Sequence, residues 1–337
     1  MRAVAYQKTQ PIDADTSLVD IKLPKPTPSG RDILVEVKAV SVNPVDTKVR
    51  GSAAPAAGEW KVLGWDAAGI VAAVGPDVSL FKPGDEVFYA GAINRAGSNA
   101  EFHLVDERIV GAKPKSLDFA TAAALPLTAI TAWEMLFDRL KVADVVPGAG
   151  NSILIIGGAG GVGSIAIQLA RALTDLTVIA TASRPETVEW VKDLGAHHVI
   201  DHRQPLAAQV AALGIGQPGF VFSTTNTDDH LAEIAELIAP QGRFGLIDDP
   251  QTLNIMPFKR KAVSTHWELM FTRSLFQTPD MIKQHELLDS VAELVDSGAI
   301  RSTLSDNFGV INAANLKRAH ALLESGKAKG KIVMEGF

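Results

Sequence analysis

The sequence of 337 residues contains no cysteine. Disulfides, thiolate nucleophiles and zinc sites built on cysteine are therefore excluded. Basic residues are fewer than acidic ones, 32 Lys and Arg against 38 Asp and Glu, which gives a net charge of −6. The basic residues form no run that would make a patch for a polyanion, so we expect no nucleic-acid partner.

Long apolar runs are missing as well. None approaches the ~20 residues that cross a bilayer, and the N-terminal segment MRAVAYQKTQ lacks the apolar core of a signal peptide. We therefore expect a cytoplasmic protein with no membrane partner. Hydrophobic residues at 47% and charged residues at 21% are ordinary globular composition. The length suggests about two domains.

Short β-branched runs separated by Pro and Gly dominate roughly the first 125 residues. The candidate strands are ILVEVKAVSV (33–42), GIVAAVG (69–75) and AEFHLVD (100–106). Many short strands with such turns favour a closed or partly closed barrel. A lone strand, KIVMEG (331–336), follows two C-terminal helical patterns and needs a sheet to join. We expect it to return to the N-terminal barrel.

From about residue 127 onward the sequence pattern changes, and predicted strands alternate with predicted helices. SILIIG (152–157) and TVIATAS (177–183) are predicted strands, and VGSIAIQLARAL (162–173) between them is a predicted helix. Such alternation is typical of a parallel, doubly wound sheet with right-handed crossovers. The fold class is therefore α/β.

A glycine-rich turn connects the first of these strands to its helix. Gly158, Gly160 and Gly163 have the spacing G-x-G-x-x-G. In that motif the first glycine permits a tight turn, the second lets backbone approach a pyrophosphate, and the third lets helix pack on strand. The helix N-terminus adds unpaired N–H groups and the positive end of its dipole. We expect a dinucleotide to bind here, with Gly161 and Val162 also in contact; a ligand-free connection is the alternative.

The end of the second strand indicates which dinucleotide. NAD enzymes place a carboxylate there to hold the ribose 2′-hydroxyl, but this strand ends at Ser183 and Arg184. Ser183 can donate a hydrogen bond, and Arg184 can pair with a phosphate through two N–H groups. The pair favours NADPH as the cofactor. The alternative for Arg184 is a solvated surface side chain.

Taken together, these motifs resemble the medium-chain dehydrogenase/reductase superfamily. SVNPVDTKVRG (41–51), LGWDAAGIVAAVG (63–75) and GKIVMEGF (330–337) follow its quinone oxidoreductase branch, and more narrowly the group named zinc-type alcohol dehydrogenase-like proteins. The resemblance implies a discontinuous GroES-like β-barrel catalytic domain, residues 1–126 and 268–337. It also implies a Rossmann cofactor domain, residues 127–267, and a homodimer.

The zinc ligands of the superfamily are absent despite the group's name. Relatives that use zinc hold it with two cysteines and the histidine of a GHE motif. Here the first cysteine position matches Asn43, and the GHE motif reads Gly64-Trp65-Asp66. The eight histidines form no pair with ligand spacing. We therefore expect no metal.

The resemblance further implies roles for individual residues, each with a plain alternative. Asn43 would orient the substrate or the nicotinamide amide, or form the turn before a proline. Trp65 would wall the substrate pocket, or pack in the core. Thr131 would lie near the nicotinamide or its phosphates, or cap a helix. His202 would flank the adenine, or lie in a solvated loop. Lys331 would approach a phosphate or the ribose, or be a surface lysine.

The reaction implied is a zinc-independent, NADPH-dependent hydride transfer to a quinone or other α,β-unsaturated carbonyl, as in an NADPH:quinone oxidoreductase. Such an acceptor is already electrophilic, so a few hydrogen-bond donors around its oxygen suffice. Alcohol oxidation would instead need a Lewis acid or a base. Two alternatives stay open: an alcohol dehydrogenase-like oxidoreductase, and a non-catalytic NADPH-binding redox sensor.

Overall fold

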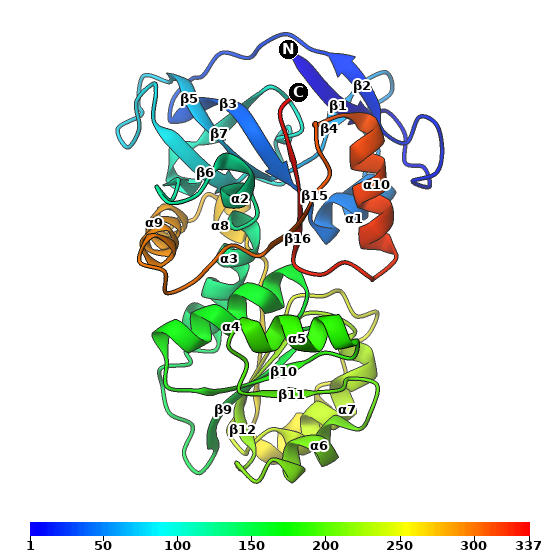
Figure 1. The fold of residues 1–337 in the computed structure, drawn as a ribbon, viewed down its shortest axis with the longest axis vertical. Coiled ribbons are helices and arrows are strands. Elements are labelled where there is room, and N and C mark those ends of the chain that lie inside the picture. Colours follow the sequence, from blue (N-terminus) through cyan, green and yellow to red (C-terminus); the bar gives the residue numbers. More distant parts are fainter. The chain divides into compact units, whose positions relative to one another are not determined.

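The computed structural model describes all residues, 1–337. The chain divides into two compact units, each described here by itself (Figure 1). Unit 1 comprises Met1–Ile130 and Phe271–Phe337, and unit 2 comprises Thr131–Met270. The first crossing falls within helix α3 (Pro126–Trp133), so one helix contributes residues to both units.

Unit 1 contains two sheets. The smaller is antiparallel, in the order β2-β1-β4. The larger has the order β15-β16-β3-β5-β6-β8, and β7 also pairs with β3. The strands are β1 (Arg2–Tyr6), β2 (Val19–Lys22), β3 (Asp32–Ser41), β4 (Lys61–Val62), β5 (Asp66–Val74), β6 (Glu86–Ala90), β7 (Phe102–Asp106), β8 (Val110–Ala112), β15 (Leu304–Asn307) and β16 (Lys331–Glu335).

The larger sheet is not a closed barrel, so of the two expected forms the fully closed one is wrong. The cause lies in β3, which pairs with β5 along one edge and shares its other edge between two short strands. Asp32–Glu36 pairs with β7, and Ala39–Ser41 pairs with β16. Neither β7 nor β16 continues the sheet far enough to reach its other end. The predicted return of the C-terminal strand to the N-terminal sheet is confirmed by the β16–β3 pairing.

Helices of unit 1 cover its larger sheet or flank it. They are α1 (Pro44–Ser52), η1 (Glu107–Ile109), α2 (Phe119–Ala123), α8 (Thr272–Phe276), α9 (Lys283–Asp296) and α10 (Ala313–Glu324). α1 begins with Pro44, whose fixed φ suits the first helical turn. α9 packs on β8, where a Cβ at Gly111 would lie 2.5 Å from Leu288 Cβ. The small residue therefore sets the closeness of that packing.

Unit 2 is built on one parallel sheet of order β11-β10-β9-β12-β13-β14. This is the order 3-2-1-4-5-6 of the dinucleotide-binding fold, and the predicted doubly wound sheet is confirmed. Its strands are β9 (Gly150–Ile156), β10 (Thr177–Thr181), β11 (His198–Ile200), β12 (Pro218–Ser223), β13 (Arg243–Leu246) and β14 (Ser264–Trp267). The central strands read as nearly continuous buried apolar runs because helices cover both faces.

Helices α4 (Gly161–Leu173) and α5 (Pro185–Asp193) lie on one face of this sheet (Figure 1). α6 (Leu206–Ala212) and α7 (Thr227–Leu237) lie on the other and share its apolar core. The π-helical η2 (Glu134–Arg139) and the 3-10 helix η3 (Met256–Lys261) complete the unit.

By length and composition the stretch Phe119–Arg139 could cross a membrane, but 83% of its most apolar window is buried in the protein. Its hydrophobicity is accounted for by the core.

Candidate active site

The glycine turn after β9 is made by a residue that the sequence motif did not single out. Gly157 has a φ of +78°, and a Cβ there would lie 2.3 Å from Thr224 Oγ1. Gly157 therefore permits the tight turn, a role that the sequence analysis gave to Gly158. Gly158 is needed for packing instead, because its Cβ would lie 2.9 Å from Ala180 Cβ on β10. The sequence signal for this role is that Gly157 is the first residue after β9.

The other two glycines of the motif differ in what the protein requires of them. At Gly163 a Cβ would lie 2.3 Å from Gly157 O and 2.7 Å from Gly158 Cα. Close helix–strand contact thus depends on Gly163, as predicted. At Gly160 the nearest atom to a Cβ would be Gly157 O at 3.5 Å, and φ is −72°. Neither the packing nor the backbone conformation explains a glycine at 160, and the space beside it is open to a ligand.

The first amides of α4 complete this turn as an anion site. Gly161, Val162 and Gly163 begin the helix, and their N–H groups have no carbonyl partner within it. The positive end of the helix dipole lies at the same point. Together with the open space at Gly160, these groups fit the pyrophosphate of a dinucleotide.

Cationic side chains gather at the carboxyl ends of β10 and β11. Arg184 is half-buried, and its Nε lies 3.2 Å from Glu186 Oε1. Arg203, which the sequence analysis missed, donates from Nη2 to Ser183 O at 2.8 Å. It also pairs with Asp201 at 2.7 Å. Ser183 and Arg203 are therefore in contact, and Arg184 directly follows Ser183 in the chain. The signal for Arg203 was its place three residues after the third strand.

His202 stands between these arginines in the sequence and is half-buried. Burial lowers the pKa of the imidazole. Asp201 opposes this shift, but His230, Arg203 and Arg184 lower the pKa further. The ring is therefore uncharged at neutral pH, which suits stacking on a base. Its placement excludes a fully solvated loop side chain.

In unit 1 the polar centre is a buried lysine. Lys331, only 3% exposed, donates from Nζ to Val42 O at 2.9 Å, to Asp66 Oδ2 at 2.9 Å and to Asn43 Oδ1. The alternative of a surface lysine is wrong. All three ammonium hydrogens are directed at protein acceptors, so a phosphate contact would require one of these bonds to break.

Asp66 organises the surroundings of this lysine. Its Oδ2 also accepts from Asn43 Nδ2 at 2.8 Å, and its Oδ1 accepts from the backbone N–H of Leu127, in the first turn of α3, at 2.7 Å. Both side chains of the Lys331–Asp66 ion pair are buried. Removing either partner would leave the other charge buried without its counterion. The carboxylate left over from the GHE motif is therefore a structural anchor.

The structure shows Asn43 at the start of a helix, which agrees with the alternative considered for it. It precedes α1, and its backbone N–H donates to Asp46 Oδ2 at 2.8 Å, which is a helix-start contact. Its side chain is held by Lys331 and Asp66. Burial raises the pKa of Asp46 to about 7, Asn43 N–H and Lys331 oppose this, and Asp66 reinforces it.

Trp65 and Thr131 are both buried. Trp65, 2% exposed, donates from Nε1 to Ala92 O at 3.3 Å, and its ring meets that of Phe271 edge-on at 5.7 Å. Those contacts place it in the core of unit 1, which was the alternative to a pocket wall. Thr131 lies in α3 at the start of unit 2.

The donor set does not fit a catalytic zinc. Asn43 Oδ1 and Asp66 Oδ2, the oxygens at the former ligand positions, both accept from the ammonium of Lys331. That ammonium is itself a cation held at the place of the metal ligands. No group of three His, Asp or Glu that could hold a metal is present in residues 1–337.

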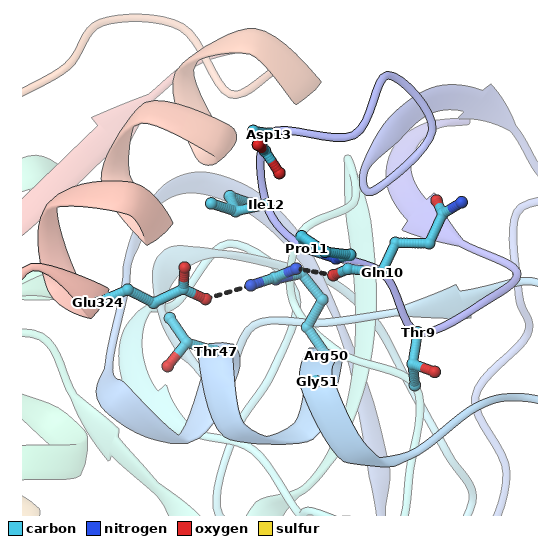
Figure 2. A pocket seen from close by; sticks show the side chains of 9 residues that line it. All are labelled: Thr9, Gln10, Pro11, Ile12, Asp13, Thr47, Arg50, Gly51 and Glu324. Atoms are coloured by element: carbon cyan, nitrogen blue, oxygen red, sulfur yellow. Dashed lines mark hydrogen bonds and ion pairs between the residues drawn. The ribbon is translucent and has the colours of Figure 1, made fainter.

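A cavity of about 550 Å³ in unit 1 lies apart from all of these residues (Figure 2). Arg50 of α1 lies buried at its base between Glu324 and the carbonyl of Gln10 and bonds to both. Arg50 Nε also donates to His320 Nδ1 at 3.3 Å. Burial and Arg50 lower the pKa of His320 to about 3, which keeps it an acceptor. The guanidinium is satisfied within the protein. The lining residues are Thr9, Gln10, Pro11, Ile12, Asp13, Thr47, Arg50, Gly51 and Glu324.

Comparisons with known proteins agree with this arrangement. Residues 29–115 match the alcohol dehydrogenase GroES-like domain, and residues 194–334 match the zinc-binding dehydrogenase family. A zinc-type alcohol dehydrogenase-like protein of Staphylococcus aureus is 43% identical over 99% of both chains. A crystal structure from Rhizobium etli, described as a zinc-dependent alcohol dehydrogenase protein, is 72% identical. It covers 100% of this chain and 98% of its own, with a TM-score of 0.98.

A more distant relative has a more specific name. The chloroplastic NADPH-dependent alkenal/one oxidoreductase of Arabidopsis thaliana is 41% identical over 185 residues, 50% of this chain and 45% of its own. On fold, glycine turn and relatives together, the chain belongs to the medium-chain dehydrogenase/reductase superfamily and is an NAD(P)-dependent oxidoreductase. Within that superfamily it groups with the proteins named zinc-type alcohol dehydrogenase-like.

Proposed function

We propose that this protein is a zinc-independent, NADPH-dependent reductase of quinones or other α,β-unsaturated carbonyl compounds. The observation that carries the choice of cofactor is the end of β10. No carboxylate stands there, and Ser183, Arg184 and Arg203 lie together instead. A 2′-phosphate would accept charge-assisted hydrogen bonds from guanidinium groups, which a ribose hydroxyl cannot match.

The residues of unit 2 bind and orient the cofactor in this proposal. When bound, NADPH would supply the hydride. The first amides of α4 bind its pyrophosphate, with Gly160 leaving room for close approach. Arg184, Arg203 and Ser183 bind the 2′-phosphate, and the uncharged ring of His202 flanks the adenine. Thr131 remains the predicted contact to the nicotinamide side.

In unit 1, Asn43 is the predicted donor to substrate or nicotinamide. Lys331 fixes which way its carboxamide points, because Nζ donates to Oδ1 and so leaves Nδ2 toward Asp66. Trp65 stiffens the same region through the core. Asn43 Nδ2 has a second N–H beyond the one that it gives to Asp66, and in this proposal that N–H donates to the acceptor oxygen; the site offers no Lewis acid. It therefore supports reduction of an already electrophilic carbonyl over oxidation of an alcohol.

The name of the Arabidopsis relative supports an enone or alkenal acceptor. The names of the Staphylococcus and Rhizobium proteins favour an alcohol dehydrogenase as the second candidate. A protein that binds NADPH without turning over is the third. The acceptor separates the three, since only the first would oxidise NADPH when a quinone or enone is added.

The test is NADPH oxidation by chelator-treated protein with 1,4-benzoquinone, an enone, or no acceptor, and NADP reduction with a simple alcohol. We expect oxidation with quinone or enone that survives chelation. Alcohol-dependent reduction of NADP that is lost on chelation would overturn the proposal. Tight NADPH binding without oxidation by any acceptor would favour the binding protein.

The same assay tests the NADPH preference. Arg184→Ala removes one charge-assisted contact, typically ~1.5–3 kcal/mol, so KM for NADPH should rise by about 10- to 100-fold. KM for NADH should not change. Arg260→Ala, an exposed cation on η3, is the matched control and should leave both values unchanged. An equal effect of Arg184→Ala on both cofactors would contradict the phosphate contact.

We further propose a homodimer formed through unit 2. β14 is an edge strand of the sheet, and its Trp267 is 52% exposed. Leu269, just after the strand, is 51% exposed. Exposed apolar residues on an unpaired edge favour pairing with another chain. Light scattering should give twice the chain mass, and Trp267→Lys should shift the measured mass toward that of the monomer.

A cytoplasmic location stays a prediction, which cell fractionation would check.

A further inference from the structure

A buried lysine stands where the names of the relatives lead one to expect zinc. The matched family is described as a zinc-binding dehydrogenase, and the Rhizobium protein as zinc-dependent. In this chain Asn43, which matches a cysteine ligand, and Asp66 of the former GHE motif both accept from the ammonium of Lys331. The disagreement between those names and this site raises the question of what the ammonium does there.

The pairing of β16 with β3 explains how the lysine reaches this position. The two strands are antiparallel, and their pairing extends past β3 to Val42, whose N–H donates to Ile332 O at 3.2 Å. The next pair in the same register is Lys331 with Asn43, at the start of α1. The C-terminal strand thus delivers its first side chain to the residue that begins this helix.

Three oxygens surround the ammonium, one for each of its hydrogens. Nζ donates to Val42 O and to Asp66 Oδ2, both at 2.9 Å, and to Asn43 Oδ1. Lys331 is 3% exposed, Asn43 1% and Asp66 0%, so water does not take the place of these contacts. Carboxylate, amide and backbone carbonyl oxygens that converge on one point are the ligands by which proteins hold a small, hard cation. Here that cation is covalently part of the chain.

The Asn43 carboxamide is held at both ends by opposite charges. The ammonium of Lys331 donates to its Oδ1, and its Nδ2 donates to Asp66 Oδ2 at 2.8 Å. A flip of the carboxamide would set two donors against each other at the lysine and two acceptors against each other at the aspartate. The charge pair therefore permits one orientation, in which the second N–H of Nδ2 is bound by neither charge.

The same contacts oppose a zinc ion. Thiolate and imidazole are the ligands that favour zinc, whereas carboxylate and carbonyl oxygens favour harder cations. A zinc ion would also have to displace the ammonium of Lys331, which would then lie buried without its counterion Asp66. Both the ligand type and the charge already present select against the metal.

Resting on the proposed function, we propose that the Lys331 ammonium is a built-in cation that replaces the metal: it positions the Asn43 carboxamide for the acceptor oxygen and keeps zinc out of the site. Lys331 has no hydrogen left for a substrate, so it acts through Asn43. It is therefore a positioning residue, and Asn43 is the group that touches the acceptor.

The first experiment replaces the tethered ammonium by a free one. Lys331→Ala keeps Cβ, so the fragment that it lacks corresponds to propylammonium. The variant is refolded from urea with and without propylammonium, so that the fragment can enter the buried site, and its melting temperature is measured. Tetramethylammonium, which has the same charge but no N–H, is the control cation. Lys22→Ala, at an exposed lysine on β2, is the control variant.

Lys331→Ala should melt about 6–20 °C below the wild type, because it leaves a buried carboxylate without its counterion. Propylammonium should restore part of this loss in a saturable way, since it binds only the folded protein. Tetramethylammonium should not restore it, and Lys22→Ala should melt like the wild type. Equal effects of the two cations, or no effect of either on a folded variant, would overturn the built-in cation.

The second experiment separates positioning from stability. In the charge-balanced double variant Lys331→Met/Asp66→Asn, Asn43 loses both charges that orient it, while no buried charge is left without a partner. We compare kcat for NADPH oxidation with 1,4-benzoquinone at a temperature at which both proteins are folded. The double variant should have a kcat about 10- to 100-fold lower than the wild type, with KM for NADPH unchanged. A wild-type kcat in the folded double variant would show that the ion pair is merely structural.

The third measurement is the zinc content of the wild type, by mass spectrometry after incubation with zinc and dialysis. We expect no stoichiometric zinc, and one bound ion per chain would overturn the exclusion. If the wild type oxidises NADPH with no acceptor, the proposed function fails, whereas the melting and zinc measurements still decide whether Lys331 is the built-in cation. If Lys331→Ala refolds with neither cation, the double variant and the zinc content decide.

Discussion

The second and third glycines of the G-x-G-x-x-G motif permit a sharp test, because the same added methyl group meets different surroundings at each. In Gly163→Ala the new Cβ would lie 2.3 Å from Gly157 O and 2.7 Å from Gly158 Cα. Both are backbone atoms that no side-chain rotation can move. Relief requires α4 to shift away from β9. Overpacking of this kind costs about 1–3 kcal/mol, which for a unit of this size lowers Tm by roughly 2–12 °C.

Gly160→Ala is the matched variant. Its Cβ would lie 3.5 Å from the nearest atom, an ordinary contact, and φ at this position suits any residue. The substitution exchanges one weak helix cap for a weaker one, which costs less than about 1 kcal/mol. Its methyl group would occupy the space that we assign to the pyrophosphate. Gly160→Ala should therefore melt near the wild type and bind NADPH at least tenfold more weakly.

Thermal unfolding followed by circular dichroism gives the stability of each variant, and fluorescence titration gives the Kd for NADPH. The reasoning requires a crossed result: Gly163→Ala loses stability, whereas Gly160→Ala loses affinity and keeps stability. A Gly163→Ala protein that melts like the wild type would refute the packing argument. A Gly160→Ala protein with unchanged affinity would show that the pyrophosphate does not approach this turn.

Two further predictions concern the polar centre of unit 1. Lys331→Met should lower the unfolding free energy, measured in urea, by about 3–5 kcal/mol, because it leaves the buried Asp66 carboxylate without its counterion. The double variant Lys331→Met/Asp66→Asn should recover part of that loss. If the effects of the two substitutions on the unfolding free energy simply add, the ion pair is contradicted. Asp46 has a folded pKa of about 7, above its ordinary value, so its folded form holds a proton that the unfolded chain releases. Stability should therefore fall as pH rises from about 4 to about 7 and then level off. Asp46→Asn should remove that part of the profile, and an unchanged profile would contradict it.

Much of unit 2 could be predicted from sequence because its signals are local. The alternation of strands and helices fixes a parallel sheet, and the glycine spacing marks its phosphate turn. The motif did not reveal that Gly157 makes the turn, since φ depends on the path that the chain takes out of β9. Arg203 was missed for a similar reason: only the folding of β11 beside β10 brings it to Ser183.

Unit 1 was less predictable because its decisive contacts are distant in sequence. Lysine is almost always exposed, so nothing in the sequence around Lys331 indicates burial. Its ammonium is enclosed by Asn43, 288 residues away, and by Asp66, 265 residues away. The barrel failed to close for a comparable reason. The way in which β7 and β16 divide one edge of β3 depends on where each strand arrives, and a strand's own residues do not encode that.

The pairing of β16 with β3 has a consequence for how the protein is made. β3 leaves the ribosome early, but the strand that completes its edge, and the lysine that neutralises Asp66, follow only after all of unit 2 has been synthesised. Unit 2 is continuous in sequence and can fold as it emerges. Until β16 emerges, the part of the β3 edge that pairs with it has no partner and Asp66 lacks its counterion Lys331. During synthesis unit 2 can therefore fold first. Unit 1 folds later and is more exposed to aggregation and to chaperones in the meantime.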